Sequence, residues 1–164
     1  MATTDLIVLT GATGFLGFKI LIVALKAGYK VRCVVRSPSR IGKIVDAPSI
    51  KSLNLSNGQL TWATVPDMTV SGAYDDAVVG AKYVIHTASP IPSFGGEAPT
   101  PEAYEQHFVQ AASKGTLGIL ESIRKAGTVK RIVITSSVVA NVPFKYFIGQ
   151  GDDAIFDEIG RAHV

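Results

Sequence analysis

Gly11, Gly14 and Gly17 recur every three residues, directly after the apolar run at residues 6–9. A turn of this kind can hold a dinucleotide pyrophosphate. The first glycine permits the tight bend, the second lets backbone N–H groups approach the phosphates, and the third lets the helix pack on the strand. The following helix N-terminus adds unpaired N–H donors and a partial positive charge. The candidate cofactor-binding residues of this turn are Gly11, Thr13, Gly14, Phe15, Leu16 and Gly17. The alternative is an ordinary glycine-rich turn without a ligand.

Two arginines follow about twenty residues after the turn, where a NAD-selective domain would place an acid for the ribose hydroxyls. Arg36 stands at that point, and Arg40 comes one helical turn later. A guanidinium group binds phosphate with a fork of N–H donors, whereas a carboxylate would repel it. The pair therefore predicts NADP(H), with NAD(H) less favoured. The alternative is two solvated surface arginines.

The strands that must position these residues are indicated by short, β-branched apolar runs. Most of these runs lack the alternation of apolar and polar residues, which is typical of parallel strands covered on both faces. The expected strands lie at residues 6–9, 31–35, 83–85 and 132–134, with a weaker one at 59–65. Each run ends where a loop begins, so the candidate residues stand at strand ends.

Helical patterns separate the runs. Leu16, Ile20, Val23 and Ala27 predict one apolar stripe on a helix that stops at Gly28. A longer helix is expected from residue 108 to 123, and a shorter one over 71–79. Such alternation predicts an α/β fold, a Rossmann-type doubly wound parallel sheet in three layers. We expect strand order 3-2-1-4-5.

Composition limits the class of protein. At 164 residues, with 47% hydrophobic and 18% charged residues, the chain is one globular domain rather than a disordered segment. Its single cysteine, Cys33, cannot form an internal disulfide, and no Cys/His cluster has zinc spacing. A reducing, cytoplasmic setting fits a chain with a single cysteine. Neither a signal peptide nor a membrane span is recognisable.

Positive charge is concentrated in one region. The net charge is only +3, yet residues 19–51 hold many lysines and arginines and a single acid, Asp46. This excess predicts a small anionic ligand. Nucleic acid is the alternative partner, but no aromatic platform and no helix-turn-helix pattern accompany the charges. Residues 89–101, rich in proline, are expected to form an irregular loop beside the ligand site. Oligomeric state is left open.

The glycine spacing resembles that of the extended short-chain dehydrogenase/reductases, in the NAD-dependent epimerase/dehydratase superfamily. Further segments are similar to the branch with dihydroflavonol reductases and fungal aldehyde and ketone reductases: residues 65–68, 86–90, 114–120 and 134–137. The resemblance runs from about residue 6 to 158. It implies NADP(H)-dependent reduction of a small carbonyl substrate. A sugar-nucleotide epimerase or dehydratase, or a non-catalytic dinucleotide-binding fragment, remains the alternative.

The resemblance also implies individual roles. Asp67, followed by Met68, would accept a hydrogen bond from the adenine amine, and Ser137 would hydrogen-bond the substrate carbonyl. The ribose next to the nicotinamide would be lined by Thr87, Ala88 and Ser89. Asp67 could instead shape a turn, and Ser137 could be a satisfied hydroxyl at a strand end. A structural role is expected for His86.

The resemblance implies a general acid that this chain does not show. The family protonates the reduced carbonyl with a tyrosine that has a lysine four residues later. None of the five tyrosines is followed by such a lysine: Tyr29, Tyr74, Tyr83, Tyr104 and Tyr146. Residues 159–164 also depart from the family pattern and match the translation of a common sequencing adapter. We therefore expect a partial NADP(H)-binding domain at residues 1–158, with its sheet truncated after strand 5, and a non-native tail at 159–164.

Overall fold

The computed structural model describes residues 4–90, 100, 103, 105–137, 155–156 and 162–163. The chain divides into two compact units, residues 1–133 and 134–164. A five-stranded sheet contains β1 (Leu6–Thr10), β2 (Lys30–Val35), β3 (Leu60–Thr64), β4 (Tyr83–His86) and β5 (Arg131–Ile134). Its order is β3-β2-β1-β4-β5, and the pairs β1–β2, β1–β4 and β2–β3 are parallel. The predicted Rossmann-type parallel sheet and strand order are confirmed.

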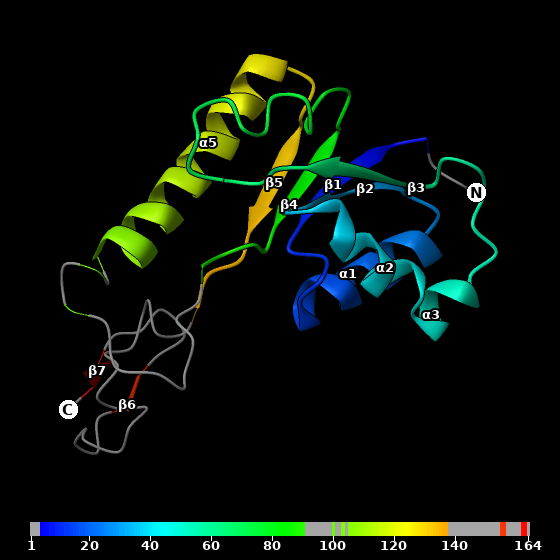
Figure 1. Ribbon diagram of the computed structural model, residues 1–164, viewed down its shortest axis with the longest axis horizontal. Coiled ribbons are helices and arrows are strands. Elements are labelled where there is room, and N and C mark those ends of the chain that lie inside the picture. Colours follow the sequence, from blue (N-terminus) through cyan, green and yellow to red (C-terminus); the bar gives the residue numbers. More distant parts are fainter. Residues whose placement is uncertain are drawn as a thin grey trace. The chain divides into compact units, whose positions relative to one another are not determined.

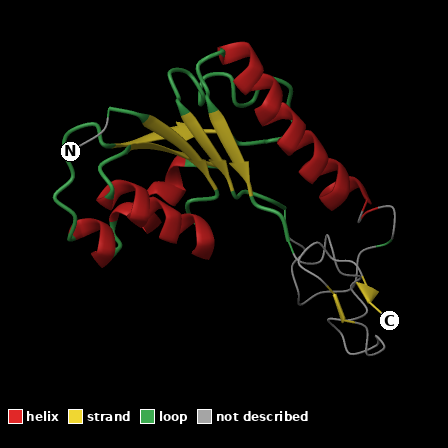
Figure 2. Ribbon diagram, turned by 180° about the vertical axis from the view of Figure 1, so that it is seen from behind, coloured by secondary structure: helices red, strands yellow, loops and turns green. Residues whose placement is uncertain are grey.

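Helices cover both faces of the sheet, as Figures 1 and 2 show from opposite sides. One face carries α1 (Phe15–Lys26), η1 (Pro38–Arg40), α2 (Ile41–Val45) and α3 (Pro48–Lys51). The other face carries α5 (Gln110–Ala126), which follows the π-helical turn η2 (Glu105–Val109). The result is the expected three-layer arrangement.

Each central strand sends side chains into two separate cores. On β1, Ile7 and Leu9 pack with α1, whereas Val8 packs with α5. The apolar runs are unbroken because both faces of these strands are buried. Cys33 of β2 lies in the α1 core, and burial raises the pKa of its thiol to about 12. It is therefore an inert, protonated thiol at neutral pH.

The expected apolar stripe of α1 is wrong as a description of its buried face. Leu16 and Val23 are 52% and 56% exposed, while Gly17, Leu21 and Ala24 are buried. The reason lies in the glycine turn. A Cβ on Gly17 would collide with the carbonyl of Gly11, so this position faces the sheet. Leu21 and Ala24, four and seven positions after Gly17, lie on the same face of the helix. The buried face therefore differs from the expected stripe.

Residues 71–79 form turns rather than the expected helix. Gly72 adopts φ +73°, a left-handed conformation that interrupts a right-handed helix. The Arg32 guanidinium donates 2.8 Å hydrogen bonds to the carbonyl oxygens of Ala77 and Val79, which are thereby satisfied without a helix. Tyr74 remains buried in the α5 core. The segment covers the sheet without regular structure.

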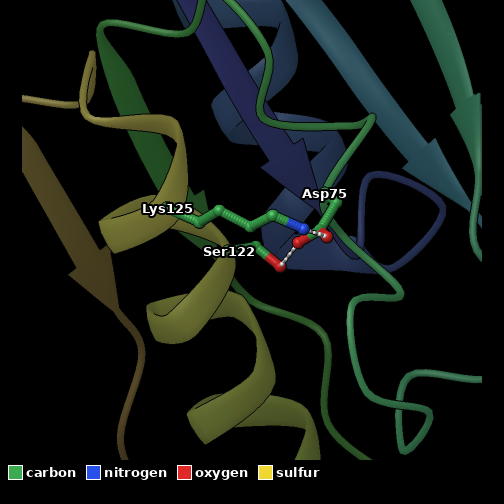
Figure 3. Close-up of polar contacts among 3 residues, drawn as sticks. All are labelled: Asp75, Ser122 and Lys125. Carbon is green, nitrogen blue, oxygen red and sulfur yellow. Dashed lines mark hydrogen bonds and ion pairs between the residues drawn. The ribbon is translucent and has the colours of Figure 1, made fainter.

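A polar cluster joins this segment to α5 (Figure 3). The Ser122 hydroxyl donates a 2.8 Å hydrogen bond to Asp75 Oδ1, and the Lys125 ammonium pairs with Asp75 Oδ2. Hydrogen bonds from Lys125 and Ser122 lower the pKa of Asp75. Asp75 therefore connects two neighbouring turns of α5 to the segment before β4.

An open apolar groove of about 510 Å³ lies on the α1 face, over β4 and β5. Its apolar lining includes Ile20 and Val23 from α1, Ile85 from β4 and Val133 from β5. Val133 is 52% exposed. Part of the stripe expected to be buried on α1 therefore faces this groove.

In the second unit, β6 (Ile155–Phe156) pairs antiparallel with β7 (Ala162–His163). Most of the loop expected at 89–101 lies outside the described residues, as do residues 159–161 and 164 of the expected tail. The helices in the described ranges are all too short or too polar to cross a membrane. The same ranges contain no cluster of three potential metal-ligating side chains.

Candidate nucleotide-binding site

Thr10, the last residue of β1, joins β1 to the segment that follows β4. Its buried Oγ1 accepts hydrogen bonds from the N–H groups of Thr87, at 3.2 Å, and Ala88, at 3.1 Å. The Thr87 hydroxyl in turn donates to the Thr10 carbonyl at 2.7 Å. These contacts lie at the carboxyl ends of two adjacent parallel strands, where ligands bind in open α/β sheets.

The same hydroxyl determines the protonation of His86. Thr10 Oγ1 lies 2.9 Å from His86 Nδ1 and already accepts two N–H bonds. Its own proton therefore goes to Nδ1, which must be the unprotonated nitrogen of a neutral imidazole. Burial lowers the pKa of His86 and favours the same state. His86 is a structural residue of this edge, as expected.

The glycine turn passes close to the β4 end. Gly11 has φ +75°, and a Cβ there would lie 2.9 Å from the Ala88 nitrogen. The Gly14 N–H closes the turn on the Gly11 carbonyl at 3.0 Å. A Cβ on Gly17 would come within 3.0 Å of the Ala12 nitrogen. The tight bend and the close helix–strand packing are thus both seen, and the role of Gly14 toward phosphate stays a prediction.

The start of α1 offers hydrogen-bond donors to an anion. Gly14 is the N-cap, no side chain caps the helix, and its first turn contains no acidic residue. Thr13, Phe15 and Leu16 are exposed around it, Phe15 by 97%. The backbone N–H groups and the positive end of the helix dipole therefore face an open surface that suits a phosphate.

Arg36 and Arg40 follow the carboxyl end of β2, and both are exposed. Ser37 between them caps η1, since its Oγ accepts from the Ser39 N–H at 3.3 Å. The Arg40 N–H closes the same turn on the Ser37 carbonyl at 3.0 Å. Neither arginine forms an ion pair within the described part of the chain. Their charges are available to an anion beside the sheet edge.

Asp67 follows β3, next to the β2 end. Its Oδ1 accepts hydrogen bonds from the Thr69 N–H at 2.8 Å and the Thr69 hydroxyl at 2.7 Å. These bonds lower the pKa of Asp67, with smaller contributions from the charges of Arg36 and Lys114. Asp67 therefore shapes a turn and is ionised at neutral pH. Its role toward adenine, with Met68, stays a prediction.

The remaining candidates differ in what the structure shows of them. Thr87 and Ala88 contact Thr10 and Gly11, as described, and Ser89 follows them as an exposed residue. Ser137 lies in the second unit, exposed, three residues after β5. Its role toward a substrate stays a prediction.

Sequence reasoning assigned no role to Thr10 or to Lys114. Thr10 is the polar residue that ends the buried run of β1, and this was its only signal in the sequence. The described tyrosines offer no substitute for the expected acid. Tyr29 and Tyr83 lie at the amino ends of β2 and β4, away from the glycine turn. Burial raises the pKa of Tyr74 to about 12, which disfavours proton exchange at neutral pH.

Known proteins share this arrangement. Ketoreductase CTB6 of Cercospora beticola is 41% identical over 142 residues, covering 82% of this chain and 37% of that protein. Dihydroflavonol 4-reductase of Hordeum vulgare is 35% identical over 134 residues, covering 80% and 34%. The structure of yeast methylglyoxal/isovaleraldehyde reductase Gre2, complexed with NADPH, has a TM-score of 0.68 and 30% identity, covering 82% and 38%.

The chain thus spans less than two fifths of the length of these relatives. Residues 7–147 match the NAD dependent epimerase/dehydratase family over most of the chain. The glycine turn, the segment after β4 and all of the parallel sheet except Leu6 lie within the matched range. On this evidence the chain belongs to the NAD dependent epimerase/dehydratase family.

Proposed function

We propose that this chain is the NADP(H)-binding part of an oxidoreductase that reduces an aldehyde or ketone to an alcohol. The observation that carries the proposal is the glycine turn at the carboxyl ends of β1 and β4. Gly11 and Gly17 stand where a Cβ would collide with backbone, beside an uncapped helix start. The relatives support the same activity, since one is a ketoreductase and another is a reductase complexed with NADPH.

The glycine turn and the uncapped start of α1 fit the pyrophosphate of this cofactor. The amides at the start of α1 would hold the pyrophosphate, and Arg36 with Arg40 would hold the 2′-phosphate. Asp67 would accept a hydrogen bond from the adenine amine, and residues 87–89 would line the ribose beside the nicotinamide. When bound, NADPH supplies the hydride for carbonyl reduction.

The substrate side of the proposal rests on Ser137, which would donate a hydrogen bond to the carbonyl oxygen. Reduction also requires a proton at that oxygen, and no tyrosine in these 164 residues has a lysine four positions later. Loss of a general acid lowers rates by about 10²–10⁴-fold. We therefore expect the 164-residue chain to bind the cofactor with negligible turnover.

The proposal is tested by titrating the chain with NADPH and with NADH and following binding by calorimetry. NADPH should bind more tightly. Arg36→Ala should weaken NADPH by about tenfold, the loss of one charge-assisted contact, and leave NADH unchanged. Arg124→Ala, which removes an exposed arginine of α5 beside the Asp75 cluster, is the matched control. Equal affinity for the two dinucleotides, or an equal effect of Arg36→Ala on both, would refute the cofactor assignment.

A further inference from the structure

Helix α5 approaches the adenosine end of the proposed site through two glycines. Gly115 is buried, and a Cβ there would lie 3.1 Å from Met68 Cγ and 3.2 Å from Met68 Sδ, and nearer still to Cε. One helical turn later, a Cβ on Gly118 would lie 3.8 Å from the Met68 carbonyl oxygen. The helix therefore packs directly on the residue that follows Asp67.

This close packing places Lys114, the residue before Gly115, on the part of α5 that lies against Met68. Lys114 is exposed. Its positive charge and that of Arg36 both act on the Asp67 carboxylate. Arg36, which follows β2, and Lys114, on α5, thus both influence the charge of Asp67, which follows β3. Among the described residues, Lys114 forms no ion pair that would hold it elsewhere.

We propose that Lys114 is a specificity-determining residue that favours NADP(H) through attraction for the 2′-phosphate. This inference rests on the proposed function and adds a residue on a third element to the two arginines. A phosphate held by Arg36 beside Asp67 lies in the field of Lys114 as well, because the charges of Arg36 and Lys114 both act on the Asp67 carboxylate. Asp67 repels such a phosphate, and a second cation nearby offsets that repulsion.

The alternative role for Lys114 is to neutralise Asp67 alone. The two roles differ in the ligands they affect. Attraction for the 2′-phosphate concerns only ligands that carry this group. Neutralisation of Asp67 would act through adenine and would affect every adenine nucleotide equally.

The test compares Lys114→Gln with Lys114→Arg in the 164-residue chain, by calorimetry with NADPH, NADH, 2′,5′-ADP and 5′-AMP. Lys114→Gln should weaken NADPH and 2′,5′-ADP by about threefold to fivefold, as for one solvent-exposed charge contact, and leave NADH and 5′-AMP unchanged. Lys114→Arg should retain the affinity. Lys130→Gln, at an exposed lysine just before β5, is the matched control and should change nothing.

Two results overturn the inference: no change with Lys114→Gln, or an equal loss for all four ligands. In either case the unsubstituted chain still prefers NADPH to NADH, so the proposed function stands. If the unsubstituted chain itself binds neither dinucleotide, the proposed function fails, and the role of Lys114 fails with it.

Discussion

Thr10 is the residue that holds the segment after β4 against the end of β1. Its hydroxyl is the common acceptor for the two backbone N–H groups after β4 and lies beside His86. A hydroxyl can donate one bond and accept two, so Thr10 uses its full hydrogen-bonding capacity here. The backbone at Thr87 and Ala88 is therefore held against the glycine turn by one side chain.

Replacing this hydroxyl tests its role at the nicotinamide side of the proposed site. Thr10→Val keeps the shape but leaves two N–H groups without their acceptor, so we expect a loss of about 1–3 kcal/mol in unfolding free energy. NADPH affinity should fall by about tenfold, whereas 2′,5′-ADP, which lacks the nicotinamide half, should bind unchanged. Chemical denaturation and calorimetry measure the two effects.

Thr10→Ser is the matched variant, because it retains the hydroxyl and should preserve NADPH binding. An equal loss of NADPH and 2′,5′-ADP affinity in Thr10→Val would contradict this assignment and indicate a general loss of folding.

Sequence reasoning identified the neighbouring glycines because their spacing follows from turn geometry. It did not identify Thr10, whose partners His86, Thr87 and Ala88 lie more than 70 positions away.

At the level of elements, residues 71–80 have no regular secondary structure and are held by side-chain contacts with two other elements. They form turns rather than a regular helix, and Asp75 ties them to α5 while Arg32 ties them to β2. The segment leads into the amino end of β4, whereas α5 packs on Met68 and so borders the proposed site. The polar contacts of the segment therefore help to hold α5 on the sheet.

The Ser122 contact can be measured separately from helix propensity. Ser122→Ala removes a buried hydrogen-bond donor to Asp75 and should lower the free energy of unfolding by about 1 kcal/mol, relative to Ser113→Ala. Ser113 is exposed on the same helix, so both substitutions gain the same alanine propensity. Equal stability of the two variants in urea denaturation would show that the contact contributes nothing.

The pH dependence of this contact has a definite sign. Hydrogen bonds from Lys125 and Ser122 keep the pKa of Asp75 below its ordinary value of 3.8. The Asp75 contribution is therefore complete above that value and is lost as the pH falls through the lower pKa of the folded protein. The stability difference between Ser122→Ala and Ser113→Ala should shrink in acid.

Sequence reasoning predicted the strands and their order better than the helical faces. Buried parallel strands are apolar on both sides, so their runs are visible without knowing their partners. The face that α1 buries depends instead on the contact of Gly17 with the turn, which rotates the helix away from Val23. The turns at 71–79 likewise depend on Arg32, a residue on another element. Both differences arise from tertiary contacts.

For the molecule as a whole, the two faces of the sheet are covered unequally. The α5 core closes over Val8 and Val84, whereas the α1 face leaves the groove over β4 and β5 open. Val23 and Val133 are each more than half exposed on that groove. Apolar side chains at the edge of a sheet favour association with other apolar surfaces.

We therefore expect the 164-residue chain to self-associate and to bind a hydrophobic dye. The double variant Val23→Lys, Val133→Lys places charge in the groove and should shift the chain toward monomer and reduce dye fluorescence. Val79→Lys, at a 59% exposed valine in the turns before β4, is the control and should leave association unchanged. Sedimentation velocity at several concentrations measures the effect. A monomeric unsubstituted chain with a sharp cooperative melt would contradict the prediction, because the groove would then be too small a patch to drive association.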